Sequence, residues 1–225
     1  MHLLLSGIVG SVAYGLAGPD SDVDRVGVFA APTVDFHGLR PPRESVVTTD
    51  PDVTLHEAGK YARLALSGNP TATELMWLPD DCYETRTALG ERLVAIRSAF
   101  LSAPRVRDAY LGYASQQLRK LTTRDSTVHG RRRSAKHARH LARLLHQGRT
   151  LYATGFLEIR LADPGWFRAF GEQVAAGALG AAEELVATAE RDFDRIRTPL
   201  PDRPDEAVVE CWLRDVRAAH LPSPG

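Results

Sequence analysis

The hydrophobic pattern of the chain changes at Glu57, and this change limits the fold more than any other feature of the sequence. Before Glu57, short apolar runs are separated by turns rich in Gly, Pro and Asp, which is typical of short β-strands. After it, apolar residues recur at helical spacing. The pattern predicts strands at 3–9, 23–29, 45–48 and 53–56, then helices near 58–65, 73–78, 89–101, 106–121, 134–152, 166–176, 181–196 and 206–220.

The order of these elements predicts an α+β protein with a small mixed β-sheet core, followed by a mostly helical C-terminal half. We expect residues 1–101 to form the core, including the first helices. We expect residues 102–225 to form a helical region that covers one side of it. The chain has 225 residues, which suits one large domain or two small ones.

The composition is that of an ordinary soluble protein. Lys and Arg number 28, as do Asp and Glu, so neither disorder nor wholesale coating of nucleic acid is expected. There is no run of about 20 apolar residues, so we expect no membrane span. The apolar start has no preceding Lys or Arg, so we expect no signal peptide. Cys82 and Cys211 are far apart and lack metal-ligand spacing, which favours a reducing cytoplasm over a disulfide framework or a cysteine-based zinc site.

The two signs of charge are segregated along the chain. Residues 15–57 hold eight acidic residues and three arginines, whereas residues 131–149 hold seven Arg or Lys and no acidic residue. Two interpretations fit this asymmetry. One is an acidic metal-binding pole with a basic phosphate-binding pole, and the other is a pair of solvated faces on packed elements.

The acidic segment contains "GSVAYGLAGPDSDVDRVGVF", residues 10–29. Asp22 and Asp24 are two positions apart on a predicted strand, so their side chains point the same way. Two carboxylates on one face suit Mg²⁺, which prefers hard oxygen ligands. Gly10 and Ser11 lie at the N-terminus of a short predicted helix at 11–16, where unpaired N–H groups and the helix dipole attract phosphate. A solvated turn is the alternative for an Asp-x-Asp pair after Gly-Pro.

This segment resembles the signature of nucleotidyltransferases of the DNA polymerase β superfamily, in which an apolar strand and Gly-Gly or Gly-Ser precede Asp-apolar-Asp on the next strand. Three later segments resemble blocks of its RNA-ligase-associated branch, namely "ARLALSGNPTATELMWLP" (62–79), "KHARHLARLLHQGRTLYATGFLEIRL" (136–161) and "PDEAVVECWL" (204–213).

The resemblance implies transfer of a nucleoside monophosphate from a nucleoside triphosphate, with ATP expected, to an acceptor hydroxyl. It implies Mg²⁺ or Mn²⁺ as the cofactor, Asp22 and Asp24 as catalytic metal ligands, and Gly10 and Ser11 as nucleotide-binding residues. The helical region is then expected to cover the active-site cleft.

The superfamily's third carboxylate, on a following strand, helps to bind metal and to deprotonate the acceptor. Asp52 and Glu57 are the candidates. We choose Asp52 because Asp52, Thr54 and His56 alternate onto one polar strand face. Glu57 is the alternative, although it also suits the start of the next helix, where a negative charge is favourable.

The basic segment predicts an amphipathic helix. Lys136, His140, Arg143 and Gln147 recur on one face, and a different face carries an apolar stripe of Ala138, Leu141, Ala142 and Leu145. Given the resemblance, we expect Lys136, His140 and Arg143 to bind the triphosphate. A solvated face and an RNA-docking face are the alternatives.

The acceptor stays open between an RNA end, a protein and a small hydroxyl compound. The rival class is a catalytically inactive nucleotide- or RNA-binding regulatory protein on the same fold. Retention of Asp22 and Asp24 favours an active enzyme. The oligomeric state is open, and the tryptophans at 77, 166 and 212 are expected in the core rather than as base-stacking platforms.

Overall fold

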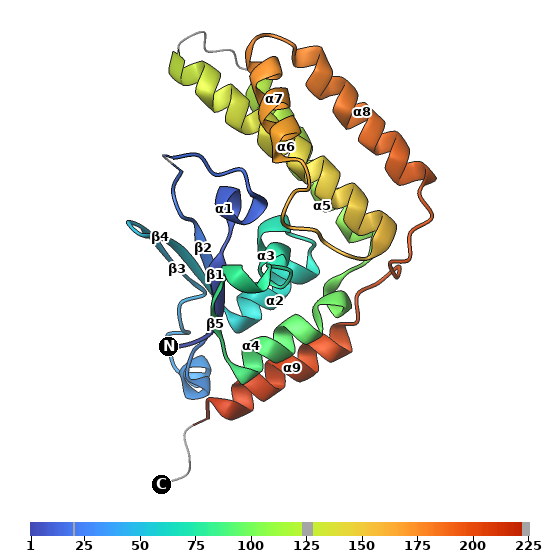
Figure 1. Cartoon of the computed structure of the whole chain (residues 1–225). Coiled ribbons are helices and arrows are strands. Elements are labelled where there is room, and N and C mark those ends of the chain that lie inside the picture. The colour runs from blue at the N-terminus through green and yellow to red at the C-terminus, as the bar shows by residue number, and fades with distance from the viewer. Residues whose placement is uncertain (20, 123–127, 222–225) are drawn as a thin grey trace. The chain divides into compact units, whose positions relative to one another are not determined.

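A computed structural model of the chain describes residues 1–19, 21–122 and 128–221. The chain splits into two compact units, Met1–Leu101 with Pro204–Gly225, and Ser102–Arg203. We call them the sheet unit and the helical unit and describe each by itself (Figure 1). The predicted fold class is confirmed, because a five-stranded mixed sheet near the N-terminus precedes a mostly helical C-terminal half.

The sheet has the order β3-β4-β2-β1-β5. Its strands are β1 (His2–Ile8), β2 (Arg25–Ala30), β3 (Ser45–Thr49), β4 (Asp52–Glu57) and β5 (Tyr83–Arg86). β2 and β4 run parallel, and the other neighbours run antiparallel. β2 is the central strand and β1 lies next to it. Both are buried on both faces, which explains their continuous apolar runs.

The same unit contains five helices in the described ranges, of which α2, α3 and α4 contact strands of the sheet. They are α1 (Gly10–Tyr14), α2 (Ala58–Leu66), α3 (Pro70–Leu75), α4 (Ala88–Ala95) and α9 (Glu206–Ala219), with short 3₁₀ turns η1 (Thr33–His37), η2 (Asp80–Cys82) and η3 (Arg97–Phe100). α2 and α3 lie on one side of the sheet (Figure 1). Asn69 caps α3 by accepting from the Ala72 N–H at 3.1 Å, and Pro70 occupies the first turn, where its missing N–H costs nothing.

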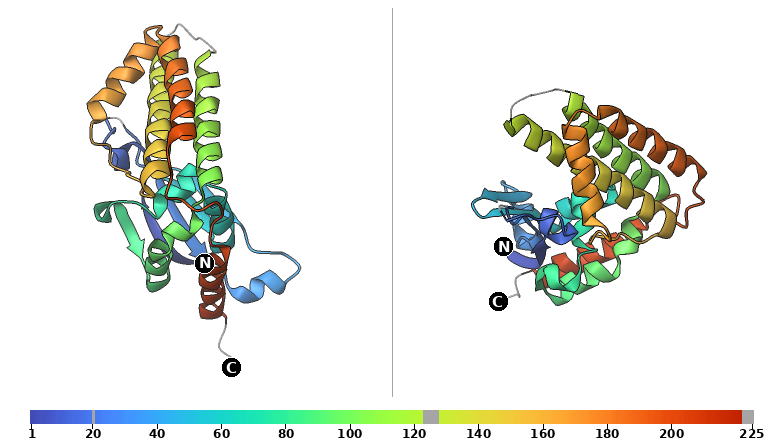
Figure 2. Two further views of the ribbon diagram at one scale, coloured as in Figure 1. Left: turned by 90° about the vertical axis from the view of Figure 1, so that its right-hand side faces the viewer. Right: turned by 45° about the horizontal axis from the view of Figure 1, so that its top comes forward.

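The helical unit contains α5 (Ala103–Thr122), α6 (Val128–Thr154), α7 (Pro164–Ala175) and α8 (Leu179–Arg195). α6 contacts each of the other three, and α5, α6 and α8 run side by side (Figures 1 and 2). The predicted apolar stripe of α6 is confirmed, because Ala138, Leu141, Ala142 and Leu145 are at most 3% exposed. In the part of the chain that the structure describes, no helix is long and apolar enough to cross a membrane.

Three details differ from the sequence expectations. The short strand β5 was not predicted. The predicted helix at 89–101 is divided into α4 and η3. The last helix, α9, packs with the sheet unit, against α2, α4 and η3, whereas the sequence pattern groups residues 204–225 with the helical region. Its Trp212 indole donates to the Leu89 carbonyl at 3.0 Å, which ties α9 to the start of α4.

Candidate functional site

The first element of the site is the junction between β1 and α1. The Val9 N–H donates to the Asp24 carbonyl at 2.9 Å, which holds the end of β1 against the residues that lead into β2. Gly10 follows with a φ of +68°, a conformation that favours glycine. A Cβ added at Gly10 would lie 2.2 Å from Asp24 Oδ2. Only glycine therefore allows the Asp24 carboxylate to lie directly against the first residue of α1.

The aspartates are placed by strand register. In the parallel pair of β2 and β4, Arg25 is opposite Val53. Asp24 and Asp52 each come one residue earlier, so they lie at the same end of neighbouring strands. Asp22 is exposed in the segment that leads into β2, Asp52 is exposed, and Asp24 is partly buried. The structure thus brings Gly10, Ser11, Asp24 and Asp52 to one end of the sheet, with Asp22 close by in sequence.

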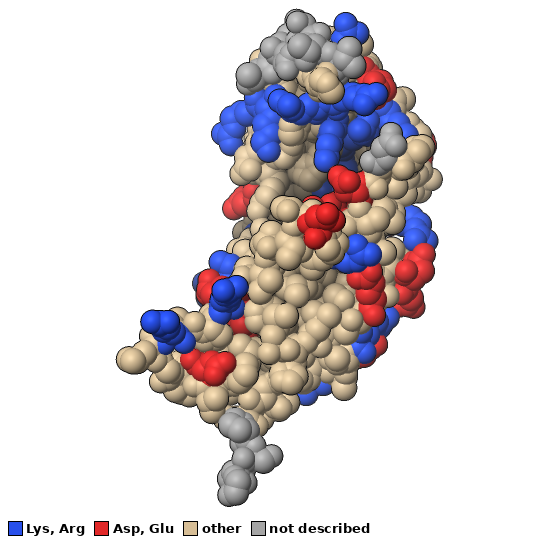
Figure 3. All heavy atoms as spheres, turned by 90° about the vertical axis from the view of Figure 1, so that its left-hand side faces the viewer, with Lys and Arg blue, Asp and Glu red and all other residues tan. Residues whose placement is uncertain are grey.

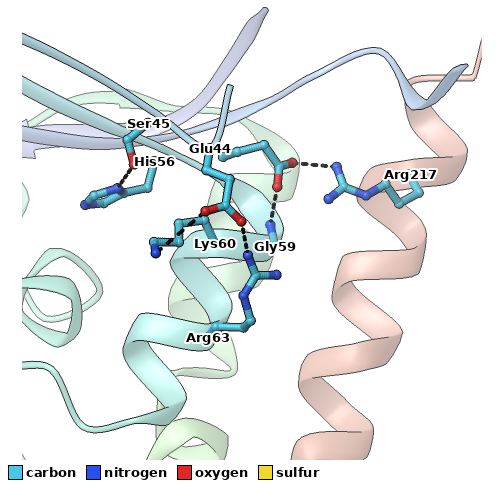
Figure 4. A network of polar contacts seen from close by, with 8 residues as sticks. Glu44, Ser45, His56, Gly59, Lys60, Arg63 and Arg217 are labelled. Atoms are coloured by element: carbon cyan, nitrogen blue, oxygen red, sulfur yellow. Dashed lines mark hydrogen bonds and ion pairs between the residues drawn. The ribbon is translucent and has the colours of Figure 1, made fainter. Parts of the chain in front are cut away.

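Glu57, the alternative third carboxylate, lies at the other end of β4, opposite Phe29. It is 4% exposed and its carboxylate accepts from the Gly59 N–H at 2.8 Å, capping α2. The same carboxylate pairs with Arg217 of α9 at 2.5 Å. Figure 4 shows Arg217 pointing from α9 towards the start of α2. Glu57 therefore joins β4, α2 and α9.

The neighbouring polar groups at this end of β4 are also paired with one another (Figure 4). Glu44 forms ion pairs with Arg63 and with Lys60. The Ser45 hydroxyl lies 2.8 Å from His56 Nδ1. Burial and the nearby Lys60 ammonium lower the pKa of His56, so its imidazole is neutral at pH 7. His56 thus adds a hydrogen bond between β3 and β4 rather than a charge.

One contributor to the site was missed by sequence reasoning. Glu74, on α3, is 2% exposed and accepts a 2.5 Å hydrogen bond from the Tyr14 hydroxyl of α1. This hydrogen bond anchors α1, which begins with Gly10 and Ser11, to α3. A glutamate within the apolar run "ELMWL" was the available signal, because a buried acid needs a partner.

The donor set suits a hard divalent cation. Asp22, Asp24 and Asp52 supply carboxylate oxygens, which Mg²⁺ and Mn²⁺ prefer. Within the ranges that the structure describes, no group of three or more His, Cys, Asp or Glu side chains is gathered closely enough to hold a metal ion. Mg²⁺ is commonly held by one or two carboxylates together with substrate phosphates. The residues present at the Asp24 end therefore fit this cation without a preformed cage.

The three candidate residues on α6 have different surroundings. Lys136 is exposed, whereas Arg143 is 3% exposed and its guanidinium donates to Gln147. Gln147 in turn donates to the Glu158 carbonyl at 2.9 Å. Burial, followed by the Arg143 charge, lowers the pKa of His140 to about 3, so this imidazole is neutral at pH 7. The face that these residues share is therefore exposed at Lys136 and buried at Arg143. The alternative interpretation, that this face is solvated, is wrong at Arg143.

Exposed cations gather where α5 ends and α6 begins, and we call this group the basic surface (Figure 3). None of its members forms an ion pair with an acidic side chain in the described ranges. Burial, followed by the charges of Lys120, Arg133 and Lys136, lowers the pKa of the nearby His137, as expected where cations converge. The basic surface consists of Arg119, Lys120, Arg131, Arg132, Arg133 and Lys136.

A mixed sheet with Gly-Ser after its first strand and aspartates entering the next one defines a nucleotidyltransferase of the DNA polymerase β superfamily. Comparison with known families narrows this class. Residues 1–159 match the RNA repair pathway DNA polymerase beta family, RlaP, and the chain belongs to that family. The assignment confirms the predicted RNA-ligase-associated branch and suggests a nucleotidyltransferase-like role in an RNA repair pathway. No curated protein matches the chain.

Proposed function

We propose that the protein is a metal-dependent nucleotidyltransferase, which moves a nucleoside monophosphate from a nucleoside triphosphate, ATP first among them, to an acceptor hydroxyl. The observation that carries the proposal is the contact between Gly10 and the Asp24 carboxylate. It sets the backbone segment that we propose to bind phosphate directly beside a candidate metal ligand. A triphosphate and its cation need such neighbours, because each neutralises the charge of the other.

The roles of the residues follow from their chemistry. The N–H groups of Gly10 and Ser11 donate to phosphate oxygens, and the N-cap residue of α1, Val9, makes no side-chain cap hydrogen bond. Asp22, Asp24 and Asp52 would hold Mg²⁺ together with the triphosphate, and the cation would supply positive charge to the oxygens that become more negative during transfer.

Asp52 also acts as the general base in this proposal. It accepts the proton of the acceptor hydroxyl, whose oxygen forms the new bond to the α-phosphorus while the bond to pyrophosphate breaks. Its exposed carboxylate makes no side-chain hydrogen bond or ion pair in the ranges that the structure describes, so fold contacts do not compete for its oxygens. Lys136 and Arg143 stay predicted ligands of the triphosphate charge, and neutral His140 stays a predicted hydrogen-bonding ligand.

RNA is the acceptor that we propose. Two observations favour it over a protein or a small hydroxyl compound. The family description places these proteins in an RNA repair pathway. The basic surface offers six exposed cations at the α5–α6 junction, and phosphate neutralisation by Lys and Arg dominates nucleic-acid affinity.

Label transfer tests the proposal. The full chain is incubated with each α-labelled nucleoside triphosphate, Mg²⁺ or Mn²⁺, and RNA carrying either a free 3′ hydroxyl or a blocked 3′ end. We expect label in the RNA with the free hydroxyl, and none with Asp24→Asn. Asp202→Asn, which changes an exposed aspartate of the helical unit, serves as the matched control.

Other products decide between the rivals. Labelled protein or small molecules in cell extract, with unlabelled RNA, would replace RNA as the acceptor. Metal-independent triphosphate or RNA binding without any labelled product would instead favour the inactive regulatory protein.

A further inference from the structure

A cavity of about 350 Å³ lies within the helical unit, between α6, α7 and α8. Its volume falls within the range of roughly 300–1,000 Å³ that is usual for small-ligand pockets. Apolar side chains, including Leu145 and Phe167, form much of its lining. None of the residues proposed for nucleotide transfer lines it. The cavity is therefore a separate candidate for ligand binding.

Two aromatic residues of the lining differ in exposure, since Phe167 is 4% exposed and Trp166 reaches the surface. Trp166 lines the cavity and is 45% exposed, so the expectation that it is a core residue is wrong, whereas Trp77 and Trp212 are buried as expected. Its ring stacks on Phe170 with centroids 5.3 Å apart and meets the edge of Phe167 at 4.8 Å. This packing fixes the indole, which gives a planar ligand a rigid surface to stack on.

The polar part of the lining has unused hydrogen-bonding capacity. The partly buried His146 imidazole makes no hydrogen bond to any residue in the described parts of the chain. Burial, followed by the Arg149 charge, lowers the pKa of His146, so at pH 7 its ring presents one donor and one acceptor. Arg149 donates through Nη1 to Asp192 at 2.7 Å, and a guanidinium has four further N–H groups.

We propose that this cavity binds one nucleotide unit, with the aromatic base against Trp166 and Phe167, the base edge hydrogen-bonded to His146, and the phosphate beside Arg149. A flat aromatic surface, a neutral donor–acceptor pair and a cation are together complementary to a base joined to a phosphate, whereas a purely apolar ligand leaves His146 and Arg149 unused. Two sources share this chemistry, a free mononucleotide and one base of an RNA strand. The inference does not depend on the proposed transfer reaction.

Calorimetric titration of the full chain tests it, with AMP in one arm and an RNA pentanucleotide in the other. Both arms contain chelator, so that metal-dependent triphosphate binding does not contribute. Trp166→Ala removes the proposed base stacking, so we expect its Kd to be about 5- to 100-fold higher. Trp166→Phe keeps an aromatic ring, so we expect a smaller change.

Arg149→Gln tests the phosphate contact and is expected to raise the Kd about 10-fold. Arg107→Gln is its matched control, because Arg107 also pairs with an aspartate of α8, Asp194 at 2.8 Å, but does not line the cavity. The control is expected to change the Kd less than 2-fold. Thermal melts of all variants verify that they are folded, and Trp166→Phe supplies a conservative variant if Trp166→Ala does not fold.

The pattern of binding decides the outcome. AMP binding that depends on Trp166 and Arg149 supports a free nucleotide, and dependence seen in the pentanucleotide arm alone supports an RNA base. Absence of binding in both arms, or a Kd that Trp166→Ala and Arg149→Gln leave unchanged, overturns the proposal. Mg²⁺-dependent triphosphate binding measured on the same variants is expected to be unchanged, so failure here is distinguishable from failure of the transfer reaction.

Discussion

Asp52 and Glu57 begin and end the same strand, and their surroundings are opposite. Asp52 is exposed, whereas Glu57 is 4% exposed, caps α2 through Gly59 and pairs with Arg217. A buried carboxylate that already has a cation and an N–H donor has little capacity left for a metal ion. An exposed carboxylate at a strand end keeps its oxygens available. The difference shows that position along a strand, not residue type, separates a fold-stabilising acid from a candidate ligand.

The largest effect is expected at the buried end of β4. Glu57→Ala leaves Arg217 without its partner and removes the α2 cap, which should lower the free energy of unfolding by about 3 kcal/mol. Asp52→Ala, the matched change at the other end, should alter it by less than about 0.5 kcal/mol. Urea denaturation followed by circular dichroism measures both. An equal loss of unfolding free energy in the two variants would contradict the conclusion that Glu57 stabilises the fold and Asp52 does not.

The exposed end is expected to govern turnover. Asp22→Asn, Asp24→Asn and Asp52→Asn each remove a charge proposed to hold Mg²⁺, so the rate of label transfer should fall at least about 100-fold, with little change in stability. Single-turnover kinetics with Asp202→Asn as control measures this. Near wild-type transfer in Asp22→Asn and Asp24→Asn would reject the metal site, and near wild-type transfer in Asp52→Asn alone would reject the third ligand.

Removing the metal tests the same end without mutation. Naked triphosphate is repelled by the aspartates, so we expect a nucleoside triphosphate to stabilise the chain only when Mg²⁺ or Mn²⁺ is present. At a ligand concentration 100 times the Kd, the stabilisation should be about 2.7 kcal/mol. Thermal melts with and without chelator provide the measurement. Equal stabilisation in chelator would favour a metal-independent binding protein.

A second contrast lies on α6, between exposed Lys136 and buried Arg143. If both bind the triphosphate, Lys136→Ala and Arg143→Lys should each weaken its binding, Lys136→Ala by roughly 1.5–3 kcal/mol and the charge-conserving change by less. Arg214→Ala, an exposed arginine of α9, is the control. An RNA-docking role for Lys136 gives a different result, namely unchanged triphosphate affinity and an RNA-binding salt slope reduced by about one. Unchanged binding of both ligands would remove both residues from the site.

The sequence predicted most of the fold, because apolar periodicity is strong in this chain. It also favoured Asp52, since alternation along 52–56 assigns that residue to a polar face. The strand β5 was missed because its sequence, "YETR", carries two charged residues in four. The burial of Arg143 was missed because α6 contacts α5, α7 and α8, so more than its apolar stripe is covered. The sequence pattern of one helix does not predict which of its faces will be covered by elements far away in the sequence.

The Tyr14–Glu74 bond is the clearest case of such a distant contact, since its partners are 60 residues apart. Tyr14→Phe keeps the ring and removes the hydroxyl that anchors α1. Removing one donor from a buried acceptor costs about 1–3 kcal/mol, and Glu74 is 2% exposed, so we expect a stability loss of about 1.5 kcal/mol. Tyr83→Phe is a matched control, because it also loses one hydrogen bond, to the Leu75 carbonyl at 2.9 Å, but does not contact α1 through it.

A positioning role for Tyr14 predicts more than lost stability. Loosening α1 shifts the N–H groups of Gly10 and Ser11 relative to Asp24, so kcat for label transfer should fall about 3- to 10-fold in Tyr14→Phe at a temperature where both variants remain folded. Tyr83→Phe should keep kcat within 2-fold despite a similar loss of stability. Steady-state kinetics that separate kcat from KM measure the difference. If the two variants lose stability equally and neither changes kcat, the Tyr14–Glu74 bond supports the fold alone, and α1 is held in place by its junction with Asp24.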